Sequence, residues 1–391
     1  MLLWFIGETS IYSQEVIHLA SLEDSSLSFD RSLGFFFCYK LANLGVSMVG
    51  QLGLSPIYND FGLRLPFLLI HLANCLLLYK ISLRILKKPK DALLCAGIFM
   101  LIPGISVGAL VVSNISLLLF LTLFIIYVEE RQRFLIYPAI ACAVFLDAGA
   151  SILCLGLFFY SLCYRHNWML VFSIVCFGIN MYLFAPIFGV PKSYFLDTIG
   201  FLAIVFTPVL FIYYCAYLYS YTFHNPPSLL NLIAFIGFIF VLLLSTRQSI
   251  KADSFLPLLS VGLPIFVDKM MRELRVRLPQ FRLKYKIRLV LVFLFLAIGN
   301  LVLFGNKLTY YFSSEHNFAY SFYEAKEIAK QLHDKGLSTI QVDGILGSRL
   351  AFYGINTSPN PKAPKLIPSK NGEIRLIYGS FVLASYSVVK Q

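Results

Sequence analysis

The stretch 7–63 concentrates acidic side chains in a chain that has few of them elsewhere. It holds these carboxylates: Glu8, Glu15, Glu23, Asp24, Asp30 and Asp60. Within it, residues 33–40 (LGFFFCYK) open an aromatic, weakly amphipathic helix of the kind that lies in a membrane interface. Because a carboxylate can take a proton from a hydroxyl group, these acids suit a site for a lipid-borne substrate at the membrane edge. Ordinary solvated loop acids would give the same pattern.

The rest of the composition is that of a membrane protein. Hydrophobic residues make up 58% of the 391 residues and charged residues only 13%, and the mean hydropathy is +0.76. Soluble proteins carry about 25% charged residues. The net charge of +12 could suit nucleic acid, but the basic residues lie in short loops between apolar runs. Cytoplasmic loops of membrane proteins have this character, so we expect membrane lipids and not nucleic acid as partners.

Apolar runs of the length of a spanning helix recur along the chain. A span needs about 20 predominantly apolar residues, and shorter runs are weaker candidates. The sequence predicts about ten spans, as follows: 64–85, 92–111, 114–128, 134–146, 150–163, 168–189, 198–220, 228–246, 254–268 and 289–305. The fold class is therefore an α-helical polytopic membrane protein, with a turn at Asp147 separating the fourth span from the fifth.

Basic residues orient these spans. Clusters of basic residues follow the first, third, fifth and ninth spans, which all end on the same side of the membrane. That side is predicted to be cytoplasmic. The opposite side receives 7–63, the loops 190–197 and 247–253, and everything after 306. Residues 1–6 are too short to span and lack the basic start of a signal peptide. We expect 1–63 to begin with a truncated first helix; the alternative is that this end lies on the outer surface.

Residues 306–391 are predicted to form a small α/β domain outside the membrane, after a transmembrane domain at 64–305. The pattern of 325–332 indicates an amphipathic helix that Gly336 ends, while 339–342 and 373–378 read as strands. We expect this domain on the periplasmic side, where it would serve acceptor recognition.

Several short motifs occur in an order that resembles a known family. They are Glu8-Thr9-Ser10-Ile11-Tyr12, Phe29-Asp30-Arg31-Ser32-Leu33, Leu63-Arg64-Leu65-Pro66-Phe67, Leu101-Ile102-Pro103-Gly104, Val112-Ser113-Asn114, Phe145-Leu146-Asp147-Ala148-Gly149-Ala150, and Thr246-Arg247-Gln248 with Phe255-Leu256-Pro257. Their order and predicted sides resemble the GT-C fold membrane glycosyltransferases, specifically the aminoarabinose transferase and protein mannosyltransferase group. The sequence departs from the family pattern where Gly7 and Asn114 replace an Asp and where Ala148 replaces a Lys.

The resemblance implies transfer of a sugar from a polyprenyl-phosphate donor to a lipid, glycan or protein acceptor at the outer face of the bacterial inner (plasma) membrane. It implies Glu8 as the general base, with Asp30 and Arg31 as further catalytic residues. In relatives the acid at the position of Asp30 can help bind a metal. No His at ligand spacing stands near Asp30 here, so we assert no metal or other cofactor.

The resemblance also implies a set of substrate contacts, namely Tyr12, Arg64, Asn114, Asp147, Arg247 and Lys251. Arginine forks fit phosphate oxygens, and an ionisable group at membrane depth, such as Asp147, indicates function. All of these except Tyr12 have an ordinary alternative: the cations could snorkel to the interface, and Asn114 and Asp147 could cap helices.

Two other functions are compatible with the sequence. A transporter or flippase of lipid-linked sugars would share the spans and an apolar groove, but broken helices and an internal repeat are not clear in the sequence. A catalytically inactive relative would explain the changes at Asn114 and Ala148.

Overall fold

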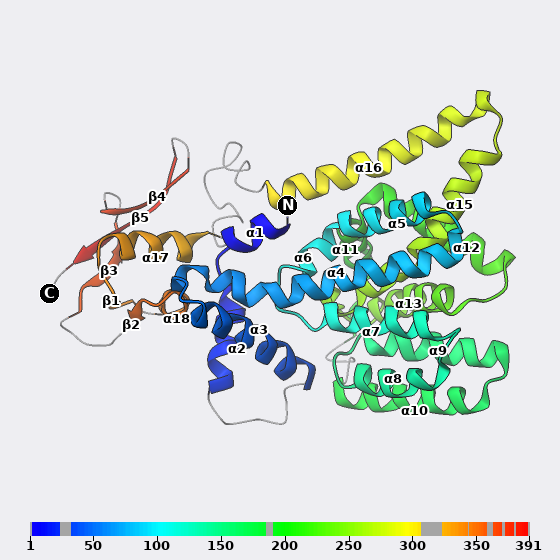
Figure 1. Cartoon of the computed structure of the whole chain (residues 1–391), viewed down its shortest axis with the longest axis horizontal. Coiled ribbons are helices and arrows are strands. Elements are labelled where there is room, and N and C mark those ends of the chain that lie inside the picture. The colour runs from blue at the N-terminus through cyan, green and yellow to red at the C-terminus, as the bar shows by residue number, and fades with distance from the viewer. Residues whose placement is uncertain are drawn as a thin grey trace. The chain divides into compact units, whose positions relative to one another are not determined.

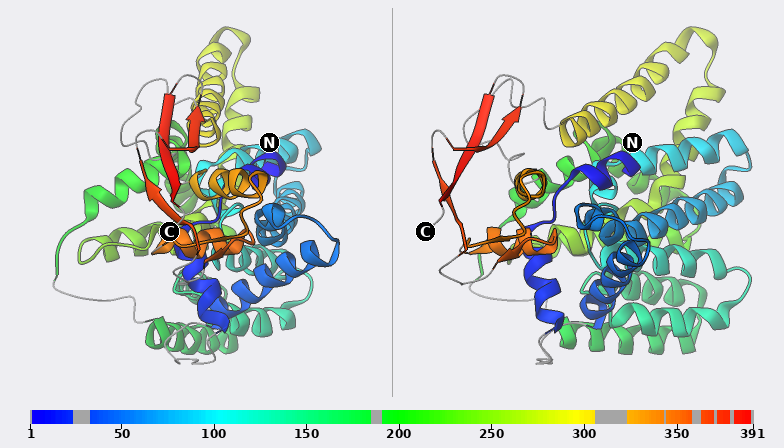
Figure 2. Two further views of the ribbon diagram at one scale, coloured as in Figure 1. Left: turned by 90° about the vertical axis from the view of Figure 1, so that its left-hand side faces the viewer. Right: turned by 60° about the vertical axis from the view of Figure 1, so that its left-hand side comes forward.

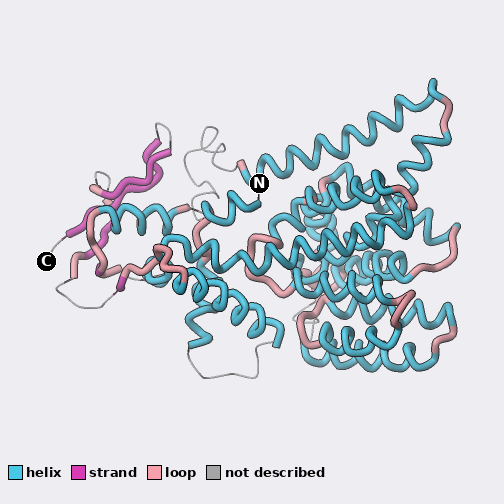
Figure 3. The backbone as a smooth tube through the Cα atoms, in the orientation of Figure 1, coloured by secondary structure: helices cyan, strands magenta, loops and turns pink. Residues whose placement is uncertain are grey.

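The computed structural model describes residues 2–23, 33–184, 191–305, 323–342, 344–357, 363–369, 372–378 and 381–389. Helices dominate the described residues, and strands occur near the C-terminus (Figure 3). The chain divides into two compact units. One, the helical unit, contains 29–35 and 69–300, and the other, the mixed unit, contains 1–28, 36–68 and 301–391. The bounds of the predicted domains stay a prediction.

The helical unit is built from packed helices (Figure 1). Their buried apolar residues form one continuous core. Its elements are most of α4 (Asn59–Leu86), α5 (Pro89–Leu101), α6 (Pro103–Gly108), α7 (Ile115–Val128), η2 (Arg133–Leu135), α8 (Ile136–Val144), α9 (Ala150–Tyr164), α10 (Asn167–Phe184), α11 (Phe195–Phe206), α12 (Pro208–His224), α13 (Leu229–Ser245), α14 (Ala252–Phe255), η3 (Leu256–Gly262), α15 (Leu263–Val276), η4 (Pro279–Phe281) and most of α16 (Arg282–Phe304). Glycines let these helices approach closely: a Cβ at Gly156 of α9 would lie 2.5 Å from Cγ1 of Ile233 on α13.

Within the described residues, five helical segments are long and apolar enough to cross a membrane. They are Leu33–Gln51, Pro56–Leu86, Asn167–Phe184, Ala252–Val276 and Pro279–Phe304. Four shorter apolar helices coincide with the predicted spans 114–128, 134–146, 150–163 and 228–246. The predicted number of about ten spans stays a prediction. Helix α3 (Leu33–Gln51), expected in the interface, is itself long enough to span.

Two runs predicted as continuous spans are each divided into two helices. The run 92–111 forms α5 and α6, which separate at Ile102. The run 198–220 forms α11 and α12, which bend by 103° at Thr207. In both cases the second helix begins with a proline, Pro103 or Pro208. Proline has no N–H for the preceding turn and its ring clashes with it, so the earlier helix ends there.

The mixed unit combines the N-terminal helices with the C-terminal α/β region (Figure 2). Its elements are α1 (Leu2–Glu8), α2 (Ser13–Glu23), most of α3, η1 (Pro56–Tyr58), the start of α4, α17 (Glu324–Asp334), β1 (Thr339–Ile340), α18 (Ile345–Phe352), β2 (Asn356–Thr357), β3 (Lys365–Pro368), β4 (Ile374–Tyr378) and β5 (Phe381–Val389). Strands β1 and β2 pair in parallel, and β5 lies between β3 and β4, antiparallel to both.

The local predictions for the C-terminal region match the structure. Helix α17 covers the predicted helix 325–332 and buries Ile328, Ala329 and Leu332. Gly336 follows with a φ of +68°, a conformation that glycine adopts without strain. Strand β4 covers all but the first residue of the predicted strand 373–378, whereas β1 covers only the first two residues of the predicted strand 339–342.

Helices α3 and α4 approach closely at two glycines. A Cβ at Gly45 of α3 would lie 2.0 Å from the carbonyl oxygen of Gly62 on α4. Any side chain at Gly45 would therefore push α3 away from α4, the helix that carries two residues of the site described next.

Candidate functional site

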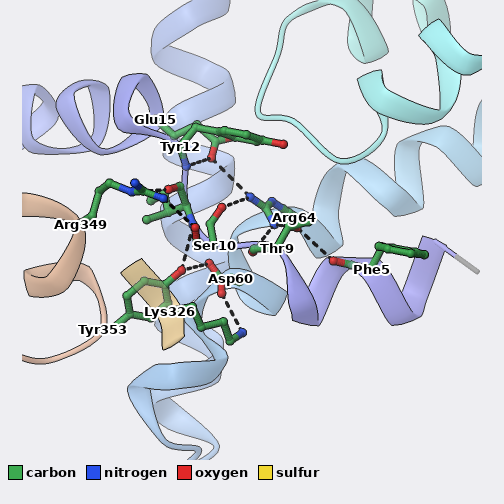
Figure 4. Close-up of polar contacts among 11 residues, drawn as sticks. Phe5, Thr9, Ser10, Tyr12, Glu15, Asp60, Arg64, Lys326, Arg349 and Tyr353 are labelled. Carbon is green, nitrogen blue, oxygen red and sulfur yellow. Dashed lines mark hydrogen bonds and ion pairs between the residues drawn. The ribbon is translucent and has the colours of Figure 1, made fainter. Parts of the chain in front are cut away.

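The segment 9–12, which connects α1 to α2, runs past the first turns of α4. Asp60 and Arg64 lie four residues apart on α4, so their side chains leave the same face of the helix. Both point toward the segment (Figure 4). The motif residues Thr9 to Tyr12 and Arg64, which are over 50 positions apart in the sequence, are thus brought together.

Arg64 is fully buried, with an exposed fraction of 0%. Its guanidinium group donates to the carbonyl oxygens of Thr9 at 2.6 Å and Ser10 at 2.9 Å, and also to the Thr9 hydroxyl. Glu15 lies 3.7 Å away as its ion-pair partner. Arg64 was predicted to contact a phosphate group; its described contacts hold the N-terminal segment.

Asp60 is equally buried and has two partners from the C-terminal region. Lys326 Nζ lies 2.8 Å from one carboxylate oxygen, and the Tyr353 hydroxyl donates to the other at 2.7 Å. The same hydroxyl accepts the backbone N–H of Ile11 at 2.9 Å. Burial, reinforced by Asp60, raises the pKa of Tyr353 well above its ordinary value. The hydroxyl therefore stays protonated, so that it can donate to Asp60 and accept from the Ile11 N–H at the same time.

Arg349 of α18 contacts the segment from a further direction. Its Nε donates to the carbonyl oxygen of Ile11 at 2.9 Å, and Nη2 donates to the Ser10 hydroxyl at 2.7 Å. Its third nitrogen pairs with Glu324 at 3.5 Å. Lys326 also donates to the carbonyl oxygen of Gly7 at 2.6 Å.

We call the residues around this segment the cradle: Glu15, Asp60, Arg64, Glu324, Lys326, Arg349 and Tyr353. Its three cations face three carboxylates in ion pairs that are mostly buried. Buried charges require such pairing, because the cost of removing each from water would otherwise be large. None of the four C-terminal members of the cradle was a predicted site residue.

Tyr12 lies half-buried at the start of α2. Its backbone N–H donates to the Glu15 carboxylate at 3.1 Å, as in a capping box, and the Arg64 guanidinium lies 5.5 Å from its ring. Burial raises the pKa of Tyr12 to about 12, although Arg64 opposes the rise. At neutral pH this hydroxyl can donate a hydrogen bond but cannot act as a base.

In the helical unit, the structure brings Asn114 and Asp147 together. The Asn114 amide donates to the carbonyl oxygen of Leu146 at 3.1 Å, and an Asp147 oxygen accepts the N–H of Gly149 at 3.1 Å. Burial raises the pKa of the Asp147 carboxyl group, while hydrogen bonds from Gly149, Ser254 and Asn114 oppose the rise. Asp147 therefore stabilises the turn before α9 through a hydrogen bond to the backbone two residues on, with Asn114 beside it.

Arg247 and Lys251 are exposed on the loop that follows α13. This loop lies beside residues 192–194, since Arg247 accepts the N–H of Lys192 at 2.9 Å through its carbonyl oxygen. Between the loop and α11 is an open cavity of about 480 Å³. Ser249 and Ile250 line it from the loop, and α11 contributes mainly apolar residues, together with Asp197 and Thr198.

The predicted catalytic residues are the part of the site that the structure leaves undescribed. Glu8 is the last residue of α1, and its side chain lies outside the described part. Asp30 and Arg31 also lie outside the described residues. Among the residues that are described, no group of three or more His, Cys, Asp or Glu side chains could hold a metal ion. The catalytic assignments stay predictions.

Comparison with known proteins identifies the fold. No family model matches the chain, and no curated protein matches it. Two crystal structures of ArnT from Cupriavidus metallidurans, one in the apo state and one bound to undecaprenyl phosphate, are similar to it. Each has a TM-score of 0.54 at 14% sequence identity, over 90% of this chain and 72% of that one. The chain therefore has a GT-C-like fold, as the motif order indicated.

Proposed function

We propose that this chain is a membrane glycosyltransferase that moves a sugar from a polyprenyl-phosphate donor to a lipid, glycan or protein acceptor. The observation that carries the proposal is the likeness, over 90% of the chain, to a structure of ArnT bound to undecaprenyl phosphate. The acidic 7–63 segment and the cavity beside α11 support it. The inner membrane is the proposed location, with the C-terminal region on the outer side.

The proposed reaction assigns roles to residues at the acceptor hydroxyl, the phosphate and the sugar. The acceptor hydroxyl attacks the anomeric carbon, its proton passes to Glu8 or Asp30, and the bond from that carbon to the phosphate oxygen breaks. Arg31 offsets the charge that develops on the departing phosphate, since cations act strongly where water is excluded. Asn114 and Asp147 are proposed to bind sugar hydroxyls.

The cavity of about 480 Å³ is the proposed site for the first units of the prenyl chain. Its apolar α11 wall suits an isoprenoid, and Arg247 and Lys251 on the adjoining loop supply cations for the phosphate. Arg64 is proposed to act through the segment 9–12 instead of touching the donor, because its described contacts are internal.

One observation favours a second candidate function. The 103° bend between α11 and α12 makes a broken span, and broken helices are typical of transporters. A transporter of lipid-linked sugars would carry the donor across the membrane without cleaving it.

Deletion of the coding sequence, followed by mass spectrometry of membrane lipids and glycans, tests the proposal. Wild type should restore a missing glycoconjugate, while Glu8→Gln and Asp30→Asn at equal protein levels should not. Glu130→Gln, an exposed acid of the helical unit paired with Arg84 at 3.6 Å, serves as the matched control and should restore it. Rescue by both test variants would refute the catalytic assignments. Loss of the product together with an accumulated, uncleaved donor that purified protein cannot consume would favour the transporter.

A further inference from the structure

The backbone on both sides of Glu8 is held by polar side chains, three of them charged, from remote parts of the chain. Before Glu8, the carbonyl oxygen of Gly7 accepts from Lys326. After it, those of Thr9 and Ser10 accept from Arg64. Ile11 is held at both its carbonyl oxygen and its N–H, by Arg349 and Tyr353. The position of Glu8 is thus set by contacts that the C-terminal region largely provides.

This segment has little internal structure to hold it in place. Residues 9–12 belong to no helix or strand, so their buried polar groups need partners from elsewhere in the protein. Helix α1 has seven residues, and an isolated helix of that length is unstable in water. Ser10 and Ile11 are nevertheless completely buried. The cradle therefore replaces the local secondary structure that would otherwise fix the segment.

We infer that Lys326, Arg349 and Tyr353 are positioning residues for the reaction. They hold the acid-bearing N-terminal segment in its working geometry, and the C-terminal region is part of the catalytic apparatus in addition to any role in acceptor recognition. The catalytic part of this inference rests on the proposed function. The ordering of the segment by these side chains does not.

Tyr353 gives the cleanest variant. Tyr353→Phe keeps the ring and removes only the hydroxyl group, which joins the N–H of Ile11 to the Asp60 carboxylate. Arg349→Gln removes the contacts to Ser10 and Ile11. Arg349→Lys keeps the positive charge but not the planar guanidinium group, whose separate nitrogens donate to the two residues. Two controls change a cation and a tyrosine elsewhere: Lys335→Gln, whose exposed partner is Glu373, and Tyr164→Phe, whose hydroxyl donates to the Pro227 carbonyl oxygen.

The experiment is hydrogen–deuterium exchange of the full-length chain in nanodiscs, read on peptides covering 9–16, together with transfer kinetics. Tyr353→Phe and Arg349→Gln should each raise the exchange rate of those amides at least tenfold and leave α9 and α13 unchanged. We expect kcat to fall at least tenfold while KM for the donor stays within twofold, since the proposed phosphate contacts lie in the helical unit. Arg349→Lys should recover part of both losses, and the two controls should behave as wild type.

The two readouts separate failure of this inference from failure of the proposed function. Unchanged exchange at 9–16 in both variants would overturn the inference even if the chain transfers sugar. Equal increases in exchange throughout the chain would also overturn it, because the residues would then be supporting the whole fold. Selective loosening of 9–16 in a chain without transferase activity would confirm the ordering by the cradle and refute the proposed function.

Discussion

Replacing Arg64 by methionine is the most informative single perturbation of the mixed unit. The change keeps a long side chain but removes the donors to the carbonyl oxygens of Thr9 and Ser10 and the cation opposite Glu15. A hydrogen bond to a charged group contributes about 1.5–3 kcal/mol, and removing one member of a buried ion pair costs about 3–5 kcal/mol. These terms share the same atoms and do not add. We therefore expect the free energy of unfolding to fall by about 3–5 kcal/mol.

Equilibrium unfolding of the purified chain in detergent, followed by circular dichroism, measures this difference. Arg64→Lys keeps the charge without the fork and should lie between Arg64→Met and wild type. Arg247→Met removes an exposed cation and should change the free energy of unfolding by less than about 0.5 kcal/mol. An Arg64→Met variant within about 1 kcal/mol of wild type would refute the structural role derived from burial. If that stable variant also lost donor binding, Arg64 would be a phosphate contact as the sequence predicted.

Three further predictions concern packing, a second ion pair and pH. Gly45→Ala should lower stability by more than about 2 kcal/mol, because its Cβ would overlap a backbone oxygen of α4. Gly50→Ala should be neutral or stabilising in the same unfolding assay, because no neighbouring atom of the described residues lies within 4 Å of an added Cβ there. Arg275→Gln should cost about 1.5–3 kcal/mol, the contribution of hydrogen bonds to a charged group, because Asp91 accepts from Arg275 at 2.5 and 2.6 Å while the Arg275 side chain is itself 39% exposed. Burial raises the folded-state pKa of Asp147, so its contribution to stability is complete below the ordinary carboxyl pKa of about 4 and is lost as the pH rises through the raised value. A thermal-unfolding series from pH 4 to pH 8 should therefore show a smaller decline for Asp147→Asn than for wild type, and identical slopes would contradict the burial argument.

Local sequence patterns predicted the C-terminal elements because those elements are amphipathic. The spacing of Ile328, Ala329 and Leu332 defines one face of α17, and Gly336 ends it. The membrane-type helices carry no such signal, since a run that is apolar on every side has no hydrophobic face to reveal its bends. The 103° bend at Thr207 was therefore missed, although Pro208 was the available sign of a break.

The candidate site was predictable only where a motif supplied it. The motif order named Asn114 and Asp147 as substrate contacts, which stays a prediction, and the structure places their side chains at the same turn. The cradle could not be found in this way, because Arg349 and Tyr353 contact residues more than 330 positions earlier. Spacing does not encode such contacts. The one local hint was Arg349 itself, a charged residue in the otherwise mainly apolar helix ILGSRLAF.

Direct observation of sugar transfer by the purified chain tests the central proposal. The full-length protein in nanodiscs would be incubated with total lipid extract from the deletion strain, and polyprenyl-phosphate species would be followed by mass spectrometry. We predict that wild type converts one polyprenyl-phosphate sugar into free polyprenyl phosphate and an equal amount of glycosylated product, and that Asp30→Asn does not. A folded wild-type chain that binds the donor and releases no polyprenyl phosphate with any acceptor in that extract would contradict the proposed function.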